Sequence, residues 1–90
     1  MTISEFNIGK ELLERIEIAE NTIDTLNKMK GATKENIFKA DLVAYKNNRT
    51  YYDKITFTQE DKNTFIKIID MLIQEEENLV SSLKEQFNNL

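Results

Sequence analysis

The chain of 90 residues contains 40% apolar and 31% charged residues, has a net charge of -4, and contains neither cysteine nor histidine. A chain of this length has room for one core, so we expect a single domain over residues 1–90. The composition excludes disulfides, thiolate or imidazole metal sites, cysteine nucleophiles and serine-histidine triads. We therefore expect a protein that is not an enzyme and that has no cofactor and no metal site.

Charge is distributed unevenly along the sequence. Residues 1–33, 34–54 and 55–90 carry net charges of -2, +2 and -4, respectively. An acidic surface repels the phosphate backbone, so duplex nucleic acid is not an expected partner. No stretch is apolar enough over its length to cross a bilayer, and the N-terminus lacks the pattern of a secretory signal. The sequence therefore predicts a cytoplasmic protein without a membrane contact.

The first third of the sequence has the pattern of an amphipathic helix. Its apolar residues recur at alternating spacings of four and three, at Leu12, Ile16, Ala19, Ile23 and Leu26. We expect this helix to begin between residues 3 and 9, near residue 5, with either Thr2 and Glu5 or Asn7 as its cap. The lysines before Gly31, and Gly31 itself, predict an end at about residue 30.

Two strands joined by a short turn are predicted in the middle of the chain, over about residues 36–57. Residues 36–45 alternate in polarity, with Phe38, Ala40, Leu42 and Ala44 sharing one face. Residues 50–57 are rich in β-branched and aromatic side chains. Asn47 and Asn48 lie between the two runs and tolerate the left-handed backbone of a tight turn. The pattern indicates an antiparallel hairpin.

A long final helix is predicted over about residues 59–88, with Thr58 and Asp61 at its cap. Its apolar residues fill two adjacent columns of a seven-residue repeat, and no glycine or proline interrupts it. The expected fold class is α+β, with a helix, an antiparallel β-hairpin and a second helix in the order α-β-β-α.

The final helix offers more apolar surface than the rest of the chain is expected to cover. It would be about 45 Å long, whereas a compact domain of this size is about 31 Å across. We expect helices packed as a coiled-coil-like bundle in a homo-oligomer, with a dimer as the first choice because two-fold closure is commonest. An antiparallel helix pair within one chain is the alternative. The expected interface residues are Phe65, Ile69, Leu72, Leu79 and Leu83.

The acidic run of residues 75–77 lies within this helix. Consecutive helical side chains point about 100° apart, so these three carboxylates do not converge on one metal ion. Glu76 falls in the same column as Ile69 and Leu83. It is either a polar residue that sets the register of an oligomer interface or a residue at the margin of that interface.

The hairpin carries the most suggestive group of polar and aromatic residues, which are Lys46, Asn48, Arg49, Tyr51, Tyr52 and Lys54. Cations that hold phosphate and rings that stack on a base would suit a small anionic nucleotide ligand. The same residue types are enriched where proteins bind proteins. A third interpretation is an exposed hairpin whose tyrosines cover the helices and whose lysines protect an edge strand from aggregation.

The segment KELLERIEIAENTIDTLNKMKG, the hairpin and the ending NLVSSLKEQFNNL together resemble the loose class of small phage or prophage proteins with an α-β-β-α order. Some members inhibit host defence by blocking a host protein or by sequestering a nucleotide signal. The resemblance implies an oligomeric binding protein that acts as an inhibitor. Such an inhibitor would either occupy a host defence factor or sequester a nucleotide ligand. The alternative function is a structural or assembly subunit whose helices mediate oligomerisation.

Overall fold

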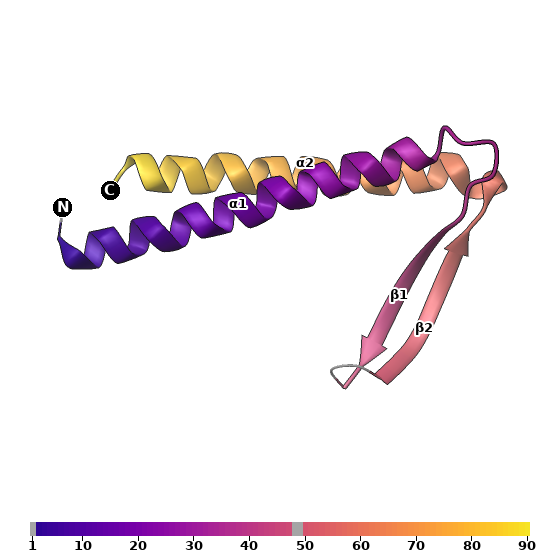
Figure 1. Ribbon diagram of the computed structural model, residues 1–90, viewed down its shortest axis with the longest axis horizontal. Coiled ribbons are helices and arrows are strands. Elements are labelled where there is room, and N and C mark those ends of the chain that lie inside the picture. Colours follow the sequence, from indigo (N-terminus) through magenta and orange to yellow (C-terminus); the bar gives the residue numbers. More distant parts are fainter. Residues whose placement is uncertain (1, 48–49) are drawn as a thin grey trace.

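The predicted α-β-β-α order is confirmed by the computed structural model, which describes residues 2–47 and 50–90 and, for residues 50–52, the backbone alone (Figure 1). The elements are helix α1 (Ile3–Ala32), strands β1 (Ala40–Lys46) and β2 (Thr50–Phe57), the 3-10 turn η1 (Gln59–Asp61) and helix α2 (Lys62–Asn88).

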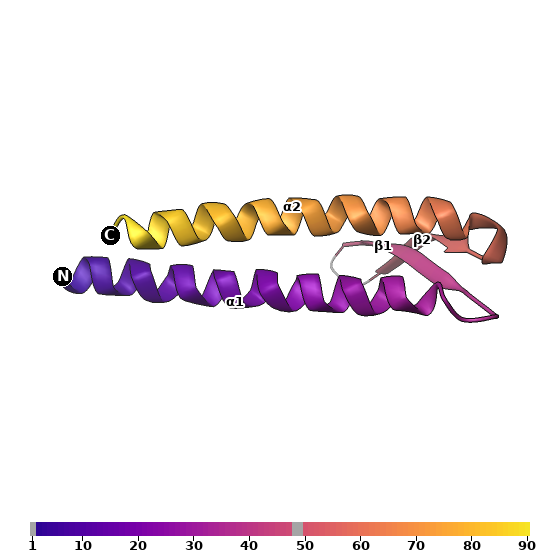
Figure 2. The same ribbon diagram turned by 90° about the horizontal axis from the view of Figure 1, so that it is seen from above.

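The two helices lie side by side and antiparallel, so both chain ends are at one end of the helix pair (Figures 1 and 2). The hairpin leaves the opposite end and projects away from the helices. The radius of gyration is 17.4 Å, whereas a compact chain of this length is expected at about 12 Å. The sequence left open whether the helices pair within one chain or between chains. In this structure α1 and α2 pair within one chain.

Helix α1 begins where the first of the two predicted caps places it. The backbone N–H of Glu5 donates to Oγ1 of Thr2 at 3.1 Å, and this hydroxyl donates to the Glu5 carboxylate, also at 3.1 Å. At the other end the helix extends two residues beyond the predicted end at about residue 30, because it continues through Gly31 to Ala32. Gly31 does not adopt the positive φ of a helix stop signal. Instead, the buried Thr33 donates its hydroxyl hydrogen bond to the carbonyl of Lys30 at 2.6 Å.

Replacing Gly31 with alanine is expected to stabilise the protein. A Cβ at this position would meet no atom within 4 Å, and alanine lowers the entropy of the unfolded chain and favours the helix by about 0.5–1 kcal/mol. Gly9→Ala is the matched control, since its Cβ would lie 3.2 Å from Cδ1 of Leu90 and its gain should be smaller. Thermal denaturation measures both; a lower melting temperature for Gly31→Ala would contradict the expectation.

Strand β1 begins at Ala40 rather than at residue 36, which corrects the predicted boundary. Phe38 precedes the strand and is buried, because its ring packs against the helices instead of joining the ladder. In the antiparallel register Leu42 pairs with Ile55, and Ala40 pairs with Phe57. A bulge between Ala44 and Tyr45 interrupts the alternation that the sequence predicts. At the turn, Asn47 has a φ of 52°, as expected for asparagine.

Helix α2 is preceded by η1, so regular α-helix begins three residues after the predicted start. The backbone N–H of Thr58 donates to the Asp61 carboxylate at 3.3 Å, which confirms the predicted pairing of these two residues. Across the helix pair, Nζ of Lys30 lies 2.7 Å from Oδ1 of Asp70. Both side chains are partly exposed, so this ion pair contributes little to stability.

Two apolar clusters hold the chain together. The hairpin-end core joins the base of the hairpin to both helices and consists of Leu26, Phe38, Phe57, Phe65 and Ile69. The ring of Phe65 lies 5.0 Å from that of Phe38 and 5.6 Å from that of Phe57, in tilted arrangements that favour aromatic contact. The free-end core lies near the chain ends and consists of Leu12, Ile16 and Leu83, with Val80 and Phe87 packed against it.

The five residues expected at an oligomer interface occupy two different environments. Phe65, Ile69 and Leu83 are buried within the chain's own cores, so the structure corrects their placement in an interface between subunits. Leu72 and Leu79 remain exposed on α2. Ile69 and Leu83 lie on the side of α2 that packs against α1. Phe65 lies in the same seven-residue column as Leu72 and Leu79, but it is buried because Phe38 and Phe57 at the base of the hairpin pack against it.

Candidate functional site

The hairpin arm comprises residues 40–57, and its described residues pack against the helices at its base. Phe57 belongs to the hairpin-end core together with Phe38, which immediately precedes the arm. Beyond this base the strands extend away from the helix pair (Figure 1). A two-stranded hairpin is marginal in water without further packing. Its position therefore indicates a surface that gains from contact with another molecule.

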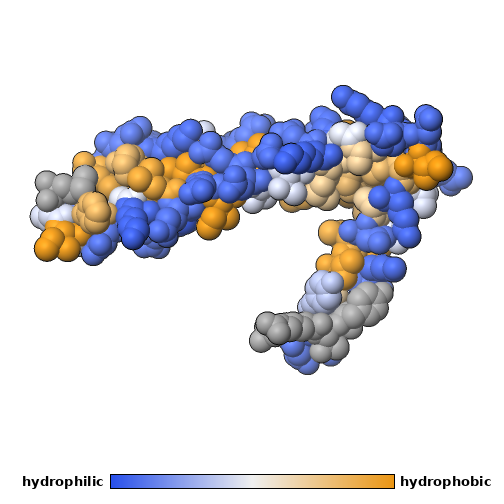
Figure 3. Space-filling view, in the orientation of Figure 1, coloured by the Kyte–Doolittle hydropathy of each residue, from blue (hydrophilic) through white to orange (hydrophobic). Residues whose placement is uncertain are grey.

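One face of the arm is apolar and exposed. Leu42 and Ile55 lie opposite each other in the ladder and are 56% and 59% exposed. Ala44 and Asp53 form the next pair on this face. These four residues line a shallow depression of about 460 Å³, which also touches Val43 and Lys54 of the pair that lies between them. The space-filling view shows apolar surface on the half of the arm next to the helices (Figure 3). Sequence reasoning did not single out Leu42 or Ile55, because the alternating pattern did not show which residues pair across the strands.

The opposite face is more polar. Thr56 donates its hydroxyl hydrogen bond to Oδ1 of Asp41 at 2.7 Å, between residues that are directly paired. Lys54 pairs with Val43 two positions further along the ladder, on the same face, and is exposed. The exposed Tyr45 follows toward the turn. The arm therefore presents an apolar face and a face of mixed charge.

Of the six residues expected to bind a ligand or partner, Lys46 and Lys54 are described with their side chains. Lys46 pairs with Thr50 near the turn, and Lys54 pairs with Val43. Lys46 and Val43 are three residues apart on β1, so the two lysines are separated by about 10 Å along the strand direction. Asn48 and Arg49 lie outside the described residues. Tyr51 and Tyr52 are described by their backbone in β2 alone. The two described cations are thus spread along the arm rather than gathered around one point.

A second surface lies midway along the helix pair. The helix groove, a depression of about 220 Å³, is lined by Arg15, Ile18, Ala19, Thr22, Glu76 and Leu79. Glu76 is half-buried there, between the hairpin-end core and the free-end core. The groove therefore combines exposed apolar side chains with one cation and one carboxylate.

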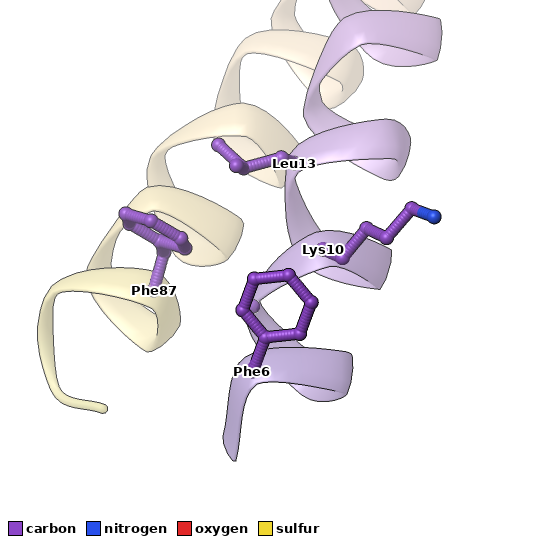
Figure 4. A pocket seen from close by; sticks show the side chains of 5 residues that line it. Phe6, Lys10, Leu13 and Phe87 are labelled. Atoms are coloured by element: carbon purple, nitrogen blue, oxygen red, sulfur yellow. The ribbon is translucent and has the colours of Figure 1, made fainter. Parts of the chain in front are cut away.

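A third depression, the terminal groove, lies at the free end of the helices. It has a volume of about 400 Å³ and is lined by Phe6, Gly9, Lys10, Leu13 and Phe87. Figure 4 shows Phe6 and Leu13 on α1 and Phe87 on α2, with the Lys10 amino group directed away from Phe87. Three of the five residues that line this groove are apolar with large side chains, so the groove offers a hydrophobic contact surface.

Within residues 2–47 and 50–90, no three acidic side chains converge to hold a metal ion. No helix in this part of the chain is long and apolar enough to cross a membrane.

Comparisons with known proteins found no matching family model and no significantly similar curated protein or solved structure. The function is consequently inferred from the geometry of the chain itself.

Proposed function

We propose that this protein is a non-enzymatic binding protein that presents its hairpin arm to a partner protein and acts by occupying that partner. The observation that carries the proposal is the exposed Leu42 and Ile55 pair on an arm that projects from the helices. Exposed apolar patches rimmed by polar residues are typical of protein interaction sites. In its most specific form, the proposal is that the partner is a host defence factor and that occupancy inhibits it.

A protein partner fits the arm better than a nucleotide. Nucleotide binding requires cations placed around one phosphate and a ring that stacks on the base. Lys46 and Lys54 lie about 10 Å apart along the strand, whereas the apolar residues lie together. A flat apolar face with polar edges is also how protein interfaces are built, with an apolar centre and a polar rim.

Replacing both Leu42 and Ile55 with serine is expected to reduce partner binding by about tenfold or more, because apolar anchors at the centre of an interface carry most of the binding energy. The fold should persist, since both side chains are more than half exposed. Tagged protein is used to retrieve partners from a cell extract, with quantitative mass spectrometry as the readout and circular dichroism as the folding check.

The matched control replaces Leu13 and Met71 with serine, since both are exposed and lie on the helices. Retrieval of the same partner in equal amount by wild type and the hairpin variant would contradict the proposal. Native mass spectrometry of the purified protein supplies a second test. If the protein retains a bound molecule with the mass of a nucleotide, the ligand is a sequestered nucleotide and the proposal of a protein partner is contradicted.

A second candidate function is that of an assembly subunit whose helices are themselves functional. It is favoured by Leu72 and Leu79, which remain exposed on α2 although they continue its apolar pattern. In that case the hairpin variant would keep full activity, and a charged residue in place of Leu79 would remove it.

A further inference from the structure

The surface area of the chain exceeds that of a compact monomer. It amounts to 7235 Å², whereas a compact protein of the same mass is expected to expose about 5,500 Å². The excess is about 1,700 Å², and each subunit of an obligate homodimer buries about 1,000–2,500 Å². The area that the elongated shape leaves exposed is thus of the size that a second copy would cover.

The exposed apolar residues of the helix pair form a stripe. Leu72 and Leu79 are seven residues apart on α2 and therefore lie on the same side of that helix. Ile18 of α1 lines the helix groove together with Leu79 of α2. The exposed apolar residues of the two helices therefore lie on the same side of the helix pair. Ile18, Leu72 and Leu79 are 66%, 45% and 40% exposed. A heptad-spaced stripe of this kind is the pattern of a helix that packs against a second neighbour.

The helix groove contains two charged side chains for which the described residues show no ion pair. Neither Arg15 nor Glu76 takes part in an ion pair in the described part of the chain, although Glu11 stands four residues before Arg15. The groove therefore holds one charge of each sign, both available for pairing with a surface of the same kind.

We propose that a second copy of this chain docks on the helix groove in a two-fold dimer, in which Arg15 of each protomer pairs with Glu76 of the other. In a two-fold interface residue i contacts residue j, and j contacts i. A surface that carries both signs is complementary to itself under this symmetry. The groove also lies near the middle of both helices, so a two-fold axis there brings the two helix pairs together over most of their length.

This inference concerns the helix pair and does not depend on what the hairpin arm binds. The proposed dimer leaves Leu42 and Ile55 outside the helix interface. If the hairpin variant still binds its partner, the proposed binding function is contradicted, but the proposed dimer is not. Likewise, a monomeric wild-type protein would overturn the dimer and leave the proposed binding function standing. The two proposals are therefore tested separately.

The first experiment measures the mass of the full chain in solution by sedimentation at micromolar concentration. We expect wild type at twice the protomer mass of 10.6 kDa. Leu79→Glu should raise the dimer dissociation constant about a hundredfold or more, because it buries an unpaired charge in each half of the interface. The matched control is Met71→Glu, which changes a 68% exposed residue on the same helix and should leave the dimer intact.

Several results would overturn the proposal. They are a monomeric wild type, an assembly larger than a dimer, a Leu79→Glu variant that stays dimeric, and a Met71→Glu variant that dissociates equally. Leu79 is partly exposed in the protomer, so Leu79→Glu should keep the helical circular dichroism of wild type. If it unfolds, the milder Leu79→Ser takes its place, with the same expected direction.

The second experiment tests the charge pairing. Arg15→Glu and Glu76→Arg should each weaken the homodimer about tenfold, since each places like charges across both halves of the interface. An equal mixture of the two variants should then form heterodimers, because Arg and Glu face each other again at both contacts. Native mass spectrometry distinguishes the heterodimer by its mass. A mixture that contains no excess of heterodimer would overturn the pairing, since charge pairing within one protomer would not be restored by mixing.

Discussion

Replacing Phe65 with alanine is expected to lower the free energy of unfolding by about 3–5 kcal/mol, the largest effect of any single substitution considered. Phe65 is buried, and its ring contacts the rings of Phe38 and Phe57 at the base of the hairpin arm. The total stability of a domain of this length is about 5–10 kcal/mol. The variant should therefore be close to unfolding, and urea denaturation followed by circular dichroism measures the loss.

The hairpin arm should respond more strongly than the helices to this change. Phe38 and Phe57 lose their common contact on α2, so amide protons of β1 and β2 should exchange faster in the variant. Met71→Ala is the control and should change stability by no more than about 0.5 kcal/mol, because Met71 is exposed on α2. Equal effects of the two substitutions would show that Phe65 does not anchor the arm.

Replacing Leu83 with alanine is expected to destabilise the protein by about 3–4 kcal/mol. Leu83 is 1% exposed and packs against Leu12 and Ile16 in the free-end core. Its removal leaves a cavity between α1 and α2, far from the hairpin arm. The increase in hydrogen exchange should accordingly appear at the two chain ends before it appears in the strands.

Leu13→Ala is the matched control for this substitution, since the same atoms are removed from a residue that is half exposed on α1. Its expected cost is about 1 kcal/mol or less. Stability of an oligomer depends on concentration, so both variants and wild type are compared at one protein concentration. A cost for Leu83→Ala no greater than that of Leu13→Ala would contradict the role of the free-end core.

Local patterns were sufficient to predict the elements. The four-three spacing from Leu12 to Leu26 predicted the buried side of α1, and Thr2 with Glu5 formed one of the two expected caps. Asn47 adopted the backbone expected of a turn asparagine. These features depend on residues within a few positions of one another, so the sequence contains all that decides them.

The errors occurred where a distant contact overrides the local pattern. Phe38 continues the alternation of β1, but packing against Phe65 draws it out of the strand. Phe65, Ile69 and Leu83 have the spacing of an interface between subunits, yet α1 of the same chain covers them. Periodicity identifies an apolar column but does not identify the helix that packs on it.

The candidate binding surfaces differ in how far they could be predicted. The sequence predicted binding residues in the hairpin, and it predicted Leu72 and Leu79, together with Phe65, Ile69 and Leu83, at an oligomer interface. It did not identify Leu42 with Ile55, or Ile18 with Leu79, as neighbours. The first pair depends on the strand register, which contains a bulge, and the second on the antiparallel alignment of two helices.

By itself, then, the sequence determined the order and nature of the elements, the absence of cysteine and histidine chemistry, and the presence of more apolar helix surface than one chain covers. Only the tertiary structure decided that Phe65, Ile69 and Leu83 are buried within the chain, whereas Leu72 and Leu79 remain exposed. It also placed Arg15 and Glu76 in one groove and Leu42 opposite Ile55. The reason is physical: hydrophobic burial is not directional, and its partners are chosen by how whole elements pack.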